Sequence, residues 1–192
     1  MAVIGFRAPA AGFDHPIEMW QACHERVKRM SALLQRLAQH LGKHGTDADA
    51  RTTATSILRY FDEAAPRHHD DEEIDLFPLL LARVAAAPAT FDGARIGAAI
   101  RALQAEHASL TTLWQAMREP LLRVQAGEPA KIDETRVLAF CTGYRAHIEV
   151  EEREIGPALE QALDTDDLRR VGRAMAARRG VDWDDITQRL GQ

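Results

Sequence analysis

HHDDEEIDLFP, residues 68–78, is matched later in the chain by HIEVEEREIGP, residues 147–157. Aligned without gaps, the two segments share four residues at equal spacing: His68 with His147, Glu72 with Glu151, Glu73 with Glu152, and Pro78 with Pro157. A helix places residues four apart on one face, so each histidine would lie beside the glutamate that follows it. The repetition indicates a shared task for these side chains rather than a solvated run of charge.

Around these segments, apolar residues recur at the spacing of helix faces that turn toward a core. Four long stretches show such series, for example Trp20, Val27, Leu34 and Leu41. Short turns between long helices place neighbours antiparallel. We therefore expect a single all-α domain over residues 1–192, with an up-down-up-down antiparallel four-helix bundle at about residues 14–163. An arginine-rich helix at about residues 166–179 is expected to cap the bundle, and Pro120 to kink or shorten the third long helix.

Four histidines fall on the inner faces of the four long helices: His24, His68, His107 and His147. Counted from the turn that joins two helices, paired histidines differ in depth by at most three residues. With about 1.5 Å rise per residue, the mismatch is under about 5 Å, so all four rings would share one layer of the core. Glu72 and Glu151 join that layer through their four-residue spacing. Burying so many polar groups is costly unless a partner such as a metal satisfies them.

One histidine on an apolar face is usually a hydrogen-bonded core residue, and one acidic run is usually solvated. The joint occurrence on four helices at one depth is what favours metal binding. The other histidines are expected at the surface or at helix ends: His15, His40, His44 and His69. Pairing His69 with Glu73 instead of His68 with Glu72 would put Asp62 on the inner face, so His69 and Glu73 are expected on the helix flank, as outer partners of the ligands. Asp71 is expected to be an exposed residue.

Imidazole and carboxylate donors suit iron, manganese or zinc, and no cysteine lies on the inner faces. Six donors are too many for one tetrahedral zinc ion. Two metal ions fit the count better, each bound by two histidines and sharing both carboxylates as bridges. The residual positive charge of such a centre favours an anionic or reducible small ligand.

These residues make the chain similar to the hemerythrin-like family of HHE cation-binding domains. The resemblance covers about residues 14–163 and rests on QACHERV around His24, EHASL around His107 and the two repeated segments. It implies two non-haem iron ions, joined by an oxo or hydroxo bridge, and a function with O2, NO or peroxide. Ferritin-like di-iron proteins share the bundle but use Glu-x-x-His, a spacing that we do not find in this sequence.

The sequence departs from the oxygen-carrying hemerythrins at Thr111, where they have a further histidine. Four histidines rather than five leave open positions at both irons, which weakens the case for simple reversible O2 carriage. Tyr144, three residues before His147 on the same face, is a candidate extra ligand, and a hydrogen-bonded core tyrosine is the alternative. The family's iron–sulfur repair members carry an N-terminal domain with paired cysteines, so that role is not expected here.

Three functions stay open from the sequence: a protein that binds or senses O2 or NO, a di-iron enzyme that acts on peroxide or NO, and a metal store or structural bundle. The net charge of −5 argues against a nucleic-acid partner. Two cysteines, Cys23 and Cys141, suit a reducing cytoplasm, and neither a signal peptide nor a membrane partner is expected. Any signal would need a protein partner, which the sequence does not identify.

Overall fold

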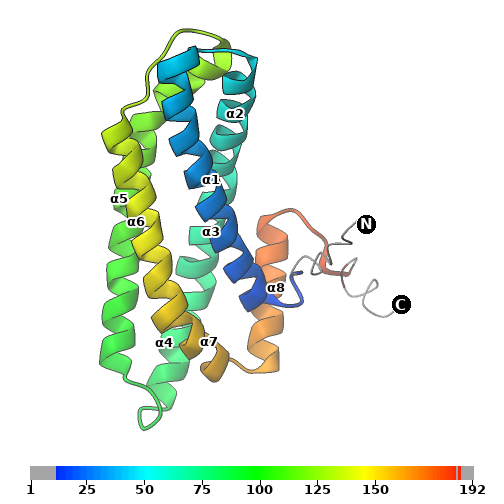
Figure 1. Cartoon of the computed structure of the whole chain (residues 1–192). Coiled ribbons are helices and arrows are strands. Elements are labelled where there is room, and N and C mark those ends of the chain that lie inside the picture. The colour runs from blue at the N-terminus through cyan, green and yellow to red at the C-terminus, as the bar shows by residue number, and fades with distance from the viewer. Residues whose placement is uncertain (1–11, 185, 187–192) are drawn as a thin grey trace, which may run out of the picture.

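A computed structural model describes residues 12–184 and 186 of the chain. Within that part every regular element is a helix, so the expectation of an all-α protein is confirmed. Two helices are long and unbroken, α1 (Pro16–His44) and α5 (Gly93–Ala126). They run along an elongated body together with two further helical rods (Figure 1). Among the described residues, no helix is both long and apolar enough to cross a membrane.

The other two rods are divided by short π-helical segments, in which the backbone turn is wider. One rod consists of α2 (Ala48–Arg59), η1 (Tyr60–Ala64), α3 (Ala65–Asp70), η2 (Asp71–Leu76) and α4 (Phe77–Ala86). The last rod consists of α6 (Glu134–Val150), η3 (Glu151–Ile155) and α7 (Gly156–Ala162). The periodic patterns predicted helices over these stretches but not the wide turns inside them.

A proline follows each wide turn, at the start of the next α-helix: Pro66, Pro78 and Pro157. Proline lacks the N–H that an α-helix would use, and its ring crowds the carbonyl four residues earlier. The residue before each proline donates instead to a carbonyl five residues back, from Phe77 to Glu72 and from Gly156 to Glu151. The wide turns thus accommodate the prolines, and such turns are frequent at functional sites. Two of them contain the glutamates of the predicted layer.

The four rods pack side by side and enclose the core, since α1 contacts α2 and α6, and α5 contacts the same two helices. Their apolar faces form two separate clusters. On α5, Leu103 belongs to one cluster and Leu110 to the other, with His107 between them. Each large side chain buried in a cluster contributes about 1.5–3 kcal/mol. The clusters therefore fix the depth of the histidine layer from both sides.

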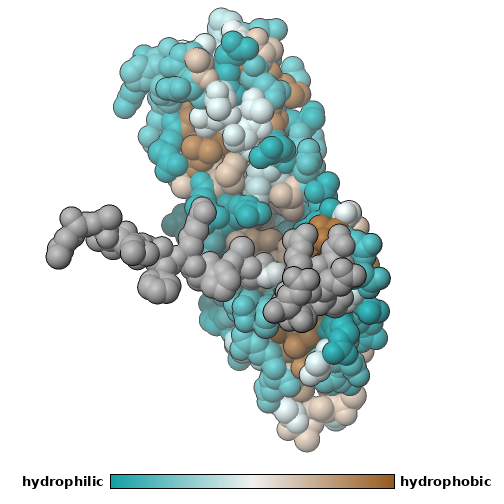
Figure 2. Space-filling model, turned by 90° about the vertical axis from the view of Figure 1, so that its right-hand side faces the viewer, coloured by the Kyte–Doolittle hydropathy of each residue, from teal (hydrophilic) through white to brown (hydrophobic). Residues whose placement is uncertain are grey.

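The C-terminal helix α8 (Thr165–Arg178) has bounds within one residue of the prediction. Asp164 caps its first turn in a reciprocal pair of hydrogen bonds with Asp167. The helix contacts α1 and η2 and lies along the flank of the bundle rather than across one end (Figure 1). Seen from that side, the surface is mainly hydrophilic with scattered apolar patches (Figure 2).

The third long helix, α5, continues through Pro120 to Ala126. The expectation that this proline would shorten the helix is therefore wrong, and the alternative, a kink, stays a prediction. The helix ends where Gly127 adopts a positive φ of 85°, a conformation that glycine adopts without the usual side-chain clash.

Candidate metal centre

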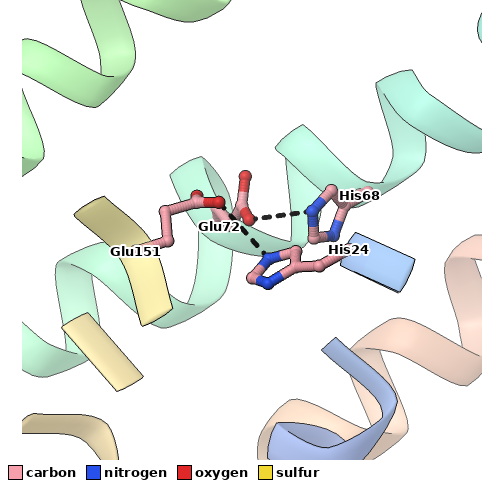
Figure 3. Close-up of side chains that lie close together, drawn as sticks. All are labelled: His24, His68, Glu72 and Glu151. Carbon is pink, nitrogen blue, oxygen red and sulfur yellow. Dashed lines mark ion pairs between the residues drawn. The ribbon is translucent and has the colours of Figure 1, made fainter. Parts of the chain in front are cut away.

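The structure brings the six predicted residues together in one buried layer. His24 comes from α1, His68 and Glu72 from α3 and η2, His107 from α5, and His147 and Glu151 from α6 and η3. All six are at most 4% exposed. Figure 3 shows four of them converging from three rods, with His68 and Glu72 on the same one: His24, His68, Glu72 and Glu151.

The six side chains form two overlapping groups of four, each with ligand atoms within 4.8 Å of one another. One group contains His24 and His68, the other contains His107 and His147, and both carboxylates belong to both groups. The layer therefore has two halves, which we call the His24 half and the His107 half, with Glu72 and Glu151 between them.

Each carboxylate oxygen faces one histidine Nε2 atom. Glu72 Oε1 lies 3.2 Å from His68, and Glu72 Oε2 lies 3.3 Å from His107. Glu151 Oε2 lies 3.3 Å from His24, and Glu151 Oε1 lies 3.3 Å from His147. Each glutamate thus presents one oxygen to each half, which is the arrangement that a carboxylate bridging two cations requires.

Several of these atoms are buried without a hydrogen-bond partner among the described residues: Glu72 Oε2, both carboxylate oxygens of Glu151, and His24 Nε2. Such atoms normally have a partner, because leaving a polar group unsatisfied in a protein interior is costly. Metal ions in the two halves would engage the lone pairs that point inward. The donor set therefore fits two cations with a preference for nitrogen and oxygen ligands.

Three of the histidines are held from behind by a second carboxylate at Nδ1. His24 Nδ1 lies 3.2 Å from Glu152, His107 Nδ1 2.6 Å from Glu73, and His147 Nδ1 2.8 Å from Glu106. A carboxylate at Nδ1 holds the proton there and leaves the inner Nε2 lone pair free for a metal. Glu73 was predicted as such a partner. Glu106 and Glu152 were not predicted, although Glu152 could have been found as the repeat of Glu73.

Electrostatics also favour a cation in this layer. Burial raises the pKa of Glu72 to about 7, assisted by the charge of Glu151, and burial likewise raises the pKa of Glu151 to about 7. Burial lowers the pKa of His24, His68 and His147. Burial also acts to lower the pKa of His107, but the carboxylates of Glu72 and Glu73 outweigh it and raise that pKa. The shifts keep the other three imidazoles neutral and make ionised carboxylates costly unless a positive charge lies between them.

His69 was expected at the surface, and this is wrong. It is half-buried, and its ring stacks on His107 with centroids 3.9 Å apart and planes 12° apart. Its Nε2 atom also lies 3.5 Å from the hydroxyl of Tyr144 on α6, so His69 packs on the side of its rod that faces α5 and α6. His69 belongs to neither group of four, and the structure places His68, not His69, in the buried layer. Whether Tyr144 ligates a metal stays a prediction.

The remaining histidines lie at the surface or near a helix end. His15 is exposed, and His44 is exposed at the end of α1. His40 contacts Asp47, which caps α2, with 2.8 Å between Nε2 and Oδ2.

Asp71 was expected to be exposed, and this is wrong. It is 1% exposed and forms ion pairs with Arg178 and Arg179, because α8 covers this flank of η2.

A cavity of about 450 Å³ adjoins the His107 half. It lies between the rod of α3 and η2 on one side and α5 on the other, and His69, Glu73, His107, Thr111 and Tyr144 are among the residues that line it. Residues of the His24 half do not line it. Of the six residues in the layer, His107 is the one that lines this cavity.

Comparison with known proteins agrees with the site. The family model of the hemerythrin HHE cation binding domain matches residues 15–159. An uncharacterized protein of Haemophilus influenzae is 38% identical over 173 residues, which cover 89% of this chain and 94% of that protein. The match spans all four long rods and every residue of the buried layer, and the chain belongs to the family of hemerythrin HHE cation-binding domains.

Proposed function

We propose that this protein is a non-haem di-iron protein that binds or senses O2 or NO, with the centre held in an up-down-up-down four-helix bundle. His24 and His68 would bind one iron, His107 and His147 the other, and Glu72 and Glu151 would bridge them. The observation that carries the proposal is the placement of one oxygen of each glutamate toward each half of the layer.

The donor set narrows the choice of metal. Four imidazoles and two carboxylates are ligands that suit iron, whereas structural zinc sites are usually rich in thiolates. Two histidines and two bridging oxygens give each ion four protein ligands, while iron with such ligands commonly takes more. The ions would supply reducing electrons and a positive field for a small ligand, and the protein would supply fixed donors in a water-poor layer.

Access supports a small ligand. The cavity beside His107 is the route by which a molecule the size of O2, NO or peroxide would approach that half. Filling it should therefore slow ligand binding without removing metal. Thr111 is exposed on α5 and lines this cavity, so Thr111→Phe should slow azide binding to the iron-loaded protein several-fold, measured by stopped-flow absorbance.

A matched control exists on the opposite side of the bundle. Ala32 lines a groove of about 370 Å³ between α1 and α6, which shares Tyr144 with the first cavity but contains none of the six layer residues. Ala32→Phe should leave the azide rate unchanged. If Ala32→Phe slows binding and Thr111→Phe does not, the ligand enters from the α1–α6 side and the route proposed here is wrong.

A second candidate function is a di-iron enzyme acting on peroxide or NO. The observation that favours it is the pair of His69 and Tyr144, whose polar atoms meet 3.5 Å apart at the wall of the same cavity. Burial holds the pKa of the Tyr144 hydroxyl above its usual range, so it would act as a hydrogen-bond donor to a ligand. Sustained turnover of peroxide by the metal-loaded protein would favour an enzyme. Stoichiometric binding of the ligand without turnover would favour a sensor. A metal store is a third candidate, but it gives the cavity no role.

Metal analysis with an absorption spectrum tests the proposal. Freshly purified protein should contain about two irons per chain, as expected for a di-iron bundle. The oxidised form should show ligand-to-iron charge-transfer bands in the near ultraviolet that change when azide is added. A single zinc ion per chain, with no iron uptake on reconstitution, would contradict it. We place the protein in the cytoplasm, where its two free cysteines would stay reduced.

A further inference from the structure

The outer face of the turn that carries Glu72 is clamped by the end of α8. Asp71 directly precedes Glu72 and is 1% exposed. Its carboxylate pairs with Arg178 and with Arg179, whose Nη2 lies 2.6 Å and whose Nη1 lies 3.1 Å from its oxygens. Arg178 also holds Asp75, one turn further along η2, with 2.8 Å between Nη2 and Oδ2.

These ion pairs are largely withdrawn from water, since the side chains of Arg178 and Arg179 are only 17% and 16% exposed. Surface ion pairs contribute little because solvent screens them, but removing one partner of a buried pair leaves an unpaired charge in the interior. The clamp therefore fixes η2 to α8 more firmly than an exposed contact would.

The inner face of the same turn fixes the Glu72 carboxylate. Trp20 Nε1 donates to Glu72 Oε1 at 2.6 Å, the same oxygen that faces His68. Trp20 packs in one apolar cluster with Leu76 of η2 and with Val171 and Met175 of α8. A movement of α8 would thus displace both the outer clamp and the packing behind Trp20, and with them the position of Glu72.

In the part of the chain that the structure describes, the repeated segment around Glu151 lacks the ion pairs with α8 that hold the turn of Glu72. Val150 occupies the position before Glu151 that Asp71 occupies before Glu72. Glu154, which matches Asp75, pairs with Arg95 of α5, and the Arg95 side chain is 64% exposed. Two bridging candidates of equal chemistry are therefore held differently: among the described residues, the turn of Glu72 forms ion pairs with the C-terminal helix, whereas the turn of Glu151 pairs with α5.

We propose that Asp71, Arg178 and Arg179 are positioning residues for Glu72, and that docking of α8 is coupled to loading of the metal centre. The proposal rests on the proposed function, because the metal is the ligand whose binding it couples. A cation that holds Glu72 from inside restrains η2 and therefore stabilises the docked α8. By reciprocity, docked α8 raises metal affinity by the same factor. The metal state would thus be reported at the surface of the molecule.

Hydrogen exchange with and without Co²⁺ tests the coupling in the full chain. Metal should slow amide exchange in α8 (Thr165–Arg178), whereas the distant α2 (Ala48–Arg59) should change less. The variant with both Arg178→Gln and Arg179→Gln should bind Co²⁺ at least tenfold more weakly, and its α8 exchange should no longer depend on metal. At saturating Co²⁺ its visible bands should shift, because the bands report the ligand geometry rather than the fold.

Arg169→Gln is the matched control, because Arg169 lies on the same helix but its ion pair among the described residues is with the exposed Asp166. It should leave affinity, bands and exchange unchanged. Replacing both arginines with lysine should restore much of the affinity, since the charges return. If the double glutamine variant does not fold, Asp75→Asn, which removes one outer ion pair, serves in its place.

Two results would overturn the inference. If the wild type loads metal but α8 exchange is the same in both states and the clamp variants bind Co²⁺ normally, the coupling is absent and the proposed di-iron function is unaffected. If the wild type takes up neither Co²⁺ nor iron, the proposed function fails and the inference fails with it.

Discussion

Glu72→Ala and Glu151→Ala will each strip the protein of both metal ions and lower its melting temperature in metal-replete buffer. Each glutamate presents one oxygen to each half of the layer, so a single substitution removes a donor from both sites at once. Metal binding at such a site is coupled to folding, and a metal present at a thousand times its Kd stabilises the folded state by about 4 kcal/mol. Metal content and thermal melting measure the two effects.

The sign of the stability effect should reverse when the metal is absent. The pKa of Glu72 is about 7 in the folded chain and has an ordinary value of 4.5, so the folded state resists its ionisation. When a carboxyl group has a raised pKa in the folded state, the free energy of unfolding falls as the pH rises from about 4.5 to about 7. At pH 8 this cost is on the order of 3 kcal/mol. Glu72→Gln removes the charge and keeps an acceptor for Trp20, so it should stabilise the metal-free protein at pH 8.

Glu63→Ala is the control, since Glu63 is exposed on the same rod and outside the layer. It should change neither metal content nor melting temperature by a measurable amount. Equal melting temperatures for Glu72→Ala and Glu63→Ala in metal-replete buffer would contradict a bridging role. A Glu72→Gln variant that is less stable than the wild type without metal at pH 8 would instead contradict the raised pKa of Glu72.

Much of the layer could be predicted because its pattern is repeated and periodic. The seven-residue series placed His24 and His107 on inner helix faces, and the residue count from each turn set their depth. The doubled His-x-x-x-Glu spacing favoured His68 and Glu72 over their neighbours. Each of these patterns concerns a single helix face, and the residues of one face recur at a fixed spacing that can be read from the sequence. The all-α architecture follows from the same periodicity.

The errors concern contacts between elements that are distant in sequence. Asp71 reads as part of an acidic surface run, and only the docking of α8 more than a hundred residues later buries it. His69 lies off the inner face of its own helix, but it faces α5 and stacks on His107. The wide turns were readable in principle, since a proline lies six residues after Tyr60, Glu72 and Glu151 alike.

His68→Ala will remove the iron, and His69→Ala will leave it in place. His68 Nε2 lies 3.2 Å from a Glu72 oxygen inside the layer, whereas His69 Nε2 faces the Tyr144 hydroxyl at the cavity wall. Losing His68 leaves the His24 half with one imidazole, and Glu72 Oε1 then keeps its hydrogen bond from Trp20 but loses the histidine beside it. The loss should appear as reduced metal content and the disappearance of the near-ultraviolet charge-transfer bands.

The neighbouring substitution is the sharpest control that the chain offers, because it makes the same chemical change one position along the chain. His69→Ala removes a ring that stacks on His107 and lines the cavity, so it should change the rate of azide binding while iron content stays near that of the wild type. A colourless His69→Ala protein beside a coloured His68→Ala protein would show that the functional register is His69 with Glu73. In that case His107 would lose its Nδ1 partner whenever metal is bound, since Glu73 cannot hold that ring and a metal with the same oxygen.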